Sequence, residues 1–274
     1  MNILVLTDFS STAIHAANYA VDLFRETTVN FYLLNIQNLN LRGSLHPDIL
    51  LGLKQVNLDQ IQDQSINLQV HSAQPNHRFY TVISEENLVA ATRRNVAERK
   101  IDLIVMGTSS IDYPNRSILG KHAREIIQKI KCNILVVSEK SEFKIPQKFV
   151  LPLDTSLYTE NNILQFLKGN IFNRDSNITV MEIGMPLAKI RKNLTIKEKF
   201  GFSEDSHQCN FLEFKKASNL NENLLQEIQE DYNMIIILGK NLSICNKLLN
   251  SSNEDWATKN NLLPVLVLHE SFKM

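Results

Sequence analysis

The chain has 274 residues, of which 43% are hydrophobic and 21% are charged. Its 29 basic residues balance its 29 acidic residues, which argues against a dedicated nucleic-acid-binding protein because such proteins usually carry a basic excess. No apolar run approaches the ~20 residues needed to cross a bilayer, so no membrane association is expected. The length suits one large domain or two of about half its size.

The N-terminus and the cysteines indicate a cytoplasmic protein. Met1 is followed directly by an apolar run, without the charged segment and cleavage site of a secretory signal. The three cysteines have no CxxC spacing, so neither a disulfide framework nor a zinc site is predicted. His71 and His77 lack a third ligand and are expected to be solvated loop residues, which leaves no metal site.

The first half alternates strand and helix patterns. Apolar, β-branched runs predict strands at residues 3–7, 29–36, 78–83, 101–106 and 134–137. Apolar residues at helical spacing predict four helices. The first begins after Ser10 or Ser11, the second runs from Pro47 to Gln64, the third is capped by Ser84, and the fourth includes residues 123–130. Strands of this kind are typical of a parallel sheet covered by helices and joined by right-handed crossovers.

The second half repeats the landmarks of the first. Residues 3–8 resemble 149–154, residues 101–107 resemble 234–239, and residues 133–137 resemble 264–268. This order indicates a duplication, with domains at 1–140 and 148–274 joined by the charged, Pro-containing connector 139–147. Further strands are expected at 178–183 and 211–215, with one helix around Ile163 to Leu167 and another opened by a capping box at residues 219–222.

We expect the two halves to pack as an intramolecular pseudo-dimer about an approximate two-fold axis. Pairing of the last strands, 134–137 and 265–268, would continue each sheet and cover its exposed edge. A short connector favours this contact over one between chains, although a homodimer of whole chains is also compatible with the sequence.

A ligand site is expected beyond the carboxyl ends of the strands, where neighbouring crossovers diverge. Asp8, the strand end near Ile36, and the loop that follows Gly107 meet there, and the helix opening at Gly120 offers free backbone amides to an anion. Two simpler interpretations stay open. Asp8 and its counterpart Asp154 could cap the following helices, and Gly107 and Gly239 could form strand-exit turns.

These motifs resemble the universal stress protein family in its tandem form. The match rests on the opening segment 3–10, on residues 102–108, and on the segment 132–137 that ends the first half. The family's nucleotide motif is Gly, two residues, Gly, nine residues, Gly and then Ser or Thr. Here that spacing holds Gly107, Ser110, Gly120 and Lys121, so two of the three glycines remain. In the second half only Gly239 and Asp154 survive, and residues 240–261 contain no glycine.

The resemblance implies an α/β fold of two tandem doubly wound parallel five-stranded sheets, Rossmann-like and similar to the adenine nucleotide alpha hydrolases. It implies ATP or a related nucleotide in the first half, with Asp8 and the backbone near Ile36 at adenine or ribose and residues 107–121 at the phosphates. The expected cofactor-binding residues are Thr7, Asp8, Ile36, Met106, Gly107, Ser110, Gly120, Lys121 and His122.

The function expected from the resemblance is that of a stress-response protein, with the nucleotide as a regulatory ligand. The alternative is a ligand-free scaffold or regulatory module that acts through an unidentified protein partner. Enzymes of the related nucleotide-binding superfamily need an HxGH signature or an SGGxDS phosphate loop, and the chain has neither. We therefore expect no catalytic residues and no enzymatic activity.

Overall fold

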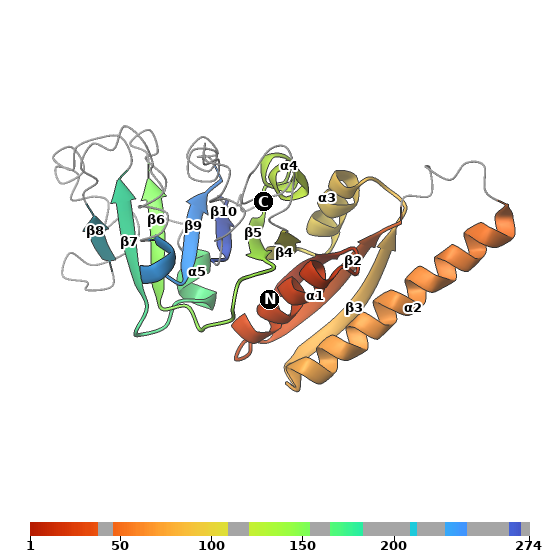
Figure 1. The fold of residues 1–274 in the computed structure, drawn as a ribbon, viewed down its shortest axis with the longest axis horizontal. Helices are drawn as coiled ribbons and strands as arrows, with labels where there is room; N and C mark the ends of the chain where they lie inside the picture. The colour runs from red at the N-terminus through yellow and green to blue at the C-terminus, as the bar shows by residue number, and fades with distance from the viewer. Residues whose placement is uncertain are drawn as a thin grey trace.

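A computed structural model of the chain describes residues 1–37, 46–108, 121–153, 165–182, 209–212, 228–239 and 263–269. Strands lie side by side across the molecule, with helices packed against them (Figure 1). The first half contains β1 (Asn2–Thr7), α1 (Ser11–Leu23), β2 (Val29–Ile36), α2 (Pro47–Ser72), β3 (His77–Ser84), α3 (Leu88–Glu98), β4 (Leu103–Thr108), α4 (Lys121–Lys129) and β5 (Asn133–Ser138). The predicted alternation of strands and helices in this half is confirmed.

The described part of the second half follows the same plan. Its elements are β6 (Lys148–Leu153), α5 (Gln165–Asn170), β7 (Asn177–Glu182), β8 (Cys209–Leu212), β9 (Met234–Leu238) and β10 (Val265–Leu268). The third predicted strand therefore begins two residues earlier than expected. The predicted capping box at residues 219–222 and the helix start near Ile163 lie outside the described residues.

Helix α2 and the start of α3 differ from the predictions. Helix α2 continues beyond Gln64 to Ser72, because Leu68 continues the face that Ile61 buries against the sheet. It ends at Ala73, whose φ of 47° is left-handed. Ser84 closes β3, and the N-cap of α3 is Asn87 instead.

The ten strands among the described residues form one sheet in the order β3-β2-β1-β4-β5-β10-β9-β6-β7-β8. Neighbouring strands within each half are parallel, whereas β5 and β10 pair antiparallel, with Leu135 opposite Leu266. The expected contact between the last strands is present, and it merges the two five-stranded sheets into one. Read outward from this junction, both halves have the same order, 5-4-1-2-3 and 10-9-6-7-8. The domain boundaries themselves stay a prediction.

Helices cover both faces of the first-half sheet. Ile3 and Val5 point to the face where Ile61 of α2 packs, and Leu4 points to the face where Ile126 of α4 packs. This alternation of buried side chains is what a doubly wound sheet requires. Among the described residues, no helix has both the length and the apolar character needed to span a membrane.

Candidate functional site

A cavity of about 610 Å³ lies at the carboxyl ends of β1, β2 and β4. The first turns of α1, α3 and α4 complete its walls. Its volume is in the range of ~300–1,000 Å³ that is usual for small-molecule sites. The residues lining it are Leu6, Thr7, Asp8, Ser10, Thr12, Ala13, Leu34, Asn35, Ile36, Asn87, Leu88, Met106, Gly107, Thr108, His122, Ala123 and Glu125.

The structure gathers most of the expected site residues at this cavity. The six that line it are Thr7, Asp8, Ile36, Met106, Gly107 and His122. Lys121 begins α4 with an exposed side chain and is not among the lining residues. Ser110 and Gly120 lie outside the described residues, so this part of the glycine motif stays a prediction.

The turn between β1 and α1 presents Asp8 at the cavity. Its Oδ1 atom accepts hydrogen bonds from the backbone N of Ser10 at 3.0 Å and from the Ser10 hydroxyl at 2.5 Å. Ser10 in turn caps α1 by accepting from the N of Ala13 at 3.2 Å. Phe9 between them has a φ of 65°, a left-handed conformation that non-glycine residues rarely adopt. Ser10 is therefore the cap, and the turn holds the exposed Asp8 carboxylate in place.

A buried polar cluster supports this turn from behind. The Thr7 hydroxyl donates to Oε1 of Gln64 on α2 at 2.8 Å and accepts from the N of Phe9 at 3.1 Å. The Asn35 side chain donates to the Thr7 carbonyl at 2.9 Å. Asn35 Oδ1 and Gln64 Nε2 are buried without a hydrogen-bond partner among the described residues. The Thr7 hydroxyl thus links helix α2 to the β1–α1 turn.

Gly107 allows the close packing of β4 against α1. It lies within β4 and pairs with Val137, so it is not the strand-exit turn of the simpler interpretation. A Cβ atom at this position would lie 2.5 Å from the carbonyl oxygen of Thr12, which is shorter than any ordinary contact. Only glycine lets the first turn of α1 approach the strand this closely.

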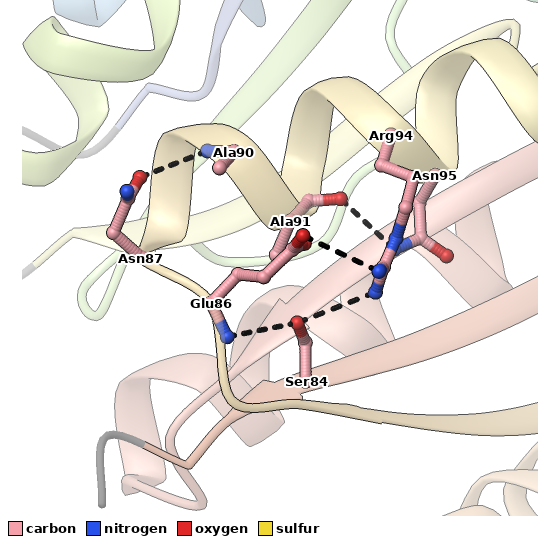
Figure 2. Close-up of polar contacts among 7 residues, drawn as sticks. All are labelled: Ser84, Glu86, Asn87, Ala90, Ala91, Arg94 and Asn95. Atoms are coloured by element: carbon pink, nitrogen blue, oxygen red, sulfur yellow. Dashed lines mark hydrogen bonds and ion pairs between the residues drawn. The ribbon is translucent and has the colours of Figure 1, made fainter. Parts of the chain in front are cut away.

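The β3–α3 turn supplies two lining residues that the sequence reasoning missed, Asn87 and Leu88. Asn87 caps α3 by accepting from the N of Ala90 at 2.9 Å (Figure 2). Arg94 of α3 reaches back to Glu86 at 3.3 Å and to the Ser84 hydroxyl at 3.5 Å (Figure 2). A polar residue three positions before Ala90 is the signal that could have located this cap.

Three helix N-termini bring the partial positive charges of their amides to the cavity, whose lining also holds the carboxylates of Asp8 and Glu125. The first turns of α1, α3 and α4 contain no acidic residue to offset the partial positive charge of their amides. Glu125, one turn into α4, accepts a hydrogen bond from Lys129 at 2.7 Å. This bond, together with nearby cationic side chains, lowers the Glu125 pKa and keeps that carboxylate paired. Three helix N-termini without acidic residues in their first turns converge on one cavity, an arrangement that favours an anion.

The corresponding place in the second half is built differently. The pairing of β9 with β10 sets Leu238 opposite Leu268, as Gly107 is opposite Val137. Leu238, and not Gly239, therefore occupies the position of Gly107, and the expected equivalence was wrong by one residue. Leu238 is buried, and the ring of His269 lies against Gly239. Burial lowers the His269 pKa to about 4, with a smaller contribution from Lys131. Asp154 lies outside the described residues.

No group of three or more His, Cys, Asp or Glu side chains in the described ranges could hold a metal ion. His77, expected to be solvated, is buried between two elements. Its Nε2 lies 3.1 Å from the carbonyl oxygen of Phe24, and its Nδ1 lies 2.6 Å from the Ser72 hydroxyl. His71 pairs with Asp22 at 3.1 Å on the surface. Both histidines are structural contacts between α1, α2 and β3.

Comparison with known proteins places this cavity in a family context. The chain is similar over 98% of its length to 98% of a universal stress protein from Archaeoglobus fulgidus DSM 4304, with a TM-score of 0.66 and 12% identity. A functionally unknown protein from Pseudomonas aeruginosa PAO1 matches with a TM-score of 0.50 and 14% identity, over 97% of this chain and 92% of that one. A universal stress protein solved in complex with cAMP matches half of the chain, with a TM-score of 0.38, 14% identity and 96% of its own length covered.

Curated proteins show no match to the chain. The two long structural matches share the whole fold, and the family model described as the universal stress protein family matches residues 1–138. That span holds the described cavity and every strand and helix that forms it. The chain belongs to the universal stress protein family.

Proposed function

We propose that this chain is a non-enzymatic stress-response protein that binds one adenine nucleotide, ATP or a close relative, in its first half as a regulatory ligand. Family membership and the cavity at the ends of β1, β2 and β4 support the proposal. In the second half Leu238 is buried where Gly107 stands in the first half, and residues 240–261 contain no glycine. We therefore expect one nucleotide per chain. The cytoplasmic location expected from the sequence stays a prediction.

The observation that carries the proposal is the convergence of three helix N-termini without acidic first turns on one cavity. Phosphate groups are the biological anions that helix N-termini bind most readily. In this proposal the triphosphate lies against the start of α4 near His122. The ribose or base lies between Asp8 and the backbone of Ile36. Both described hydrogen bonds of Asp8 use Oδ1, which leaves Oδ2 to accept from a ribose hydroxyl.

A charge substitution at the start of α4 tests the proposal. His122→Glu adds a carboxylate to the cavity wall, whereas Gln128→Glu adds the same charge to an exposed position of α4 outside the cavity. An acidic residue in the first turn stabilises a helix by ~0.3–1 kcal/mol, so His122→Glu should fold at least as well as the parent. We expect the His122 variant to bind ATP at least about tenfold more weakly, a loss of ~1.4 kcal/mol. The Gln128 variant should bind normally.

Isothermal titration calorimetry and thermal melting measure these outcomes. ATP at 100 times its dissociation constant should stabilise the parent by about 2.7 kcal/mol, at one site per chain. Equal affinities for the two variants, or two sites per chain, would show that the site is misplaced. No heat and no melting shift at millimolar ATP would instead support the ligand-free regulatory module.

A further inference from the structure

Helix α2 is longer than the sheet that it covers. Its 26 residues span about 39 Å, whereas the eight residues of β3 span about 26 Å. The helix lies at the outer edge of the molecule beside β3 (Figure 1). Its inner face is buried through Ile61, Gln64 and Leu68. The opposite face is therefore open over the whole length of the helix.

That opposite face carries a row of residues at heptad spacing, four of them apolar, which we call the outer stripe. The stripe consists of Ile49, Gly52, Val56, Asp59, Asp63, Ile66 and Val70. Steps of three and four residues alternate along it, which is the spacing of the a and d positions in a coiled coil. Its four β-branched apolar residues are exposed by 52% (Ile49), 51% (Val56), 58% (Ile66) and 74% (Val70). A helix that only covered a sheet would carry polar residues at these positions.

Charge defines what kind of surface can cover the outer stripe. Asp59 and Asp63 are exposed at its centre. The single lysine or arginine of α2 is Lys54, which forms an ion pair with Glu85 at 2.7 Å. Asp59 accepts a hydrogen bond from its neighbour Gln55 at 2.8 Å. A surface that covers the stripe must therefore bring its own cations to the two aspartates.

A second copy of this chain does not meet that requirement. Parallel pairing of two outer stripes places Asp59 opposite Asp59 and Asp63 opposite Asp63, which is unfavourable for like charges. Antiparallel pairing sets the aspartates against one another or, in shifted registers, against apolar residues or Gly52, where a carboxylate has no partner. The stripe thus carries a built-in barrier to self-association.

We propose that the outer stripe of α2 docks an amphipathic helix of another protein, which has apolar residues at its a and d positions and Lys or Arg opposite Asp59 and Asp63. The apolar residues supply the contact area, and the central ion pairs set the register and exclude acidic helices. This partner site lies on the side of α2 opposite Gln64, and it is independent of whether the cavity binds a nucleotide.

Two synthetic peptides test the proposal on the full chain. Each has three heptads with Val at a and Leu at d, except that the positions facing Asp59 and Asp63 are Lys in one peptide and Glu in the other. Fluorescence anisotropy of the labelled peptides measures binding. We expect the Lys peptide to bind at least about tenfold more tightly than the Glu peptide, and Asp63→Lys to narrow or reverse that preference.

Two further variants distinguish binding at the outer stripe from non-specific hydrophobic binding elsewhere on the chain. Ile66→Ser removes an apolar contact from the stripe and should weaken the Lys peptide about tenfold. Ile145→Ser removes a side chain that is 67% exposed outside the helix and should change nothing. Circular dichroism checks that each variant remains folded. Equal binding of both peptides, or no binding of the Lys peptide, would overturn the proposal. Sedimentation showing a dimer that Ile66→Ser dissociates would overturn it in favour of self-association.

Discussion

At the scale of single residues, the two halves differ at one equivalent strand position, which is Gly107 in the first half and Leu238 in the second. Gly107 leaves room for the carbonyl of Thr12, and Leu238 fills the matching position in the second half. The same sheet register therefore places a glycine at the end of this strand in one half and a buried leucine in the other.

We predict that Gly107→Ala destabilises the protein by about 1–3 kcal/mol, because its Cβ forces α1 away from β4. Gly52→Ala is the matched control. A Cβ at Gly52 meets nothing within 4 Å, and alanine favours a helix over glycine by ~0.5–1 kcal/mol. Urea unfolding measures both changes. A Gly107 variant as stable as the parent would mean that α1 shifts at no cost.

At the scale of elements, the polar cluster behind the β1–α1 turn connects three segments. Thr7 bonds to Gln64 of α2, to the backbone of Phe9, and through its carbonyl to Asn35 of β2. A buried polar group that loses its partner costs about 1–3 kcal/mol, whereas removing both partners costs less. The bond between Thr7 and Gln64 should therefore show strong non-additivity.

A double-mutant cycle measures that coupling. We expect Thr7→Val and Gln64→Leu each to destabilise by about 1–3 kcal/mol. Thr7→Val removes the described partner of Gln64 and of the Phe9 backbone N, and Gln64→Leu leaves the Thr7 hydroxyl without an acceptor. The double variant should lose about 1 kcal/mol less stability than the sum of the losses in the two single variants. Strictly additive effects would show that the hydroxyl and the amide do not interact in solution.

Much of the element order could be predicted from sequence, because buried parallel strands read as continuous apolar runs and their carboxyl ends meet at one edge. That rule placed Thr7, Asp8 and Ile36 correctly at the cavity. Asn87 was missed because Ser84 is an equally good cap by composition, and only the geometry distinguishes them. Gly239 was misassigned because matching letters cannot detect a one-residue slip, which moves a side chain to the other face of the sheet.

At the scale of the whole molecule, the antiparallel pairing of β5 and β10 makes the two halves one sheet. Leu135 and Leu266 oppose each other there, and both are fully buried. Each half thereby covers a strand edge that would otherwise be open to other chains. The two halves should consequently unfold together.

We predict that hydrogen exchange followed by mass spectrometry, at increasing urea concentration, shows both halves losing protection at one midpoint. Leu266→Arg places a charge in the junction and should cost more than about 3 kcal/mol. In that variant the second half should open at lower urea than the first, and the exposed β5 edge should promote dimers. Separate midpoints in the parent chain would contradict the shared junction.

The direction of the strands fixes where the carboxyl ends of the two halves lie. β5 and β10 run in opposite directions. The carboxyl ends of the first-half strands and those of the second-half strands therefore lie at opposite ends of the sheet. A small molecule that enters beside Asp8 leaves the edge around Gly239 and His269 sterically untouched. Structural coupling between these two ends would have to act over the length of the strands, about 20 Å for a six-residue strand. The cavity of the first half and the carboxyl ends of the second-half strands therefore face opposite ends of the sheet.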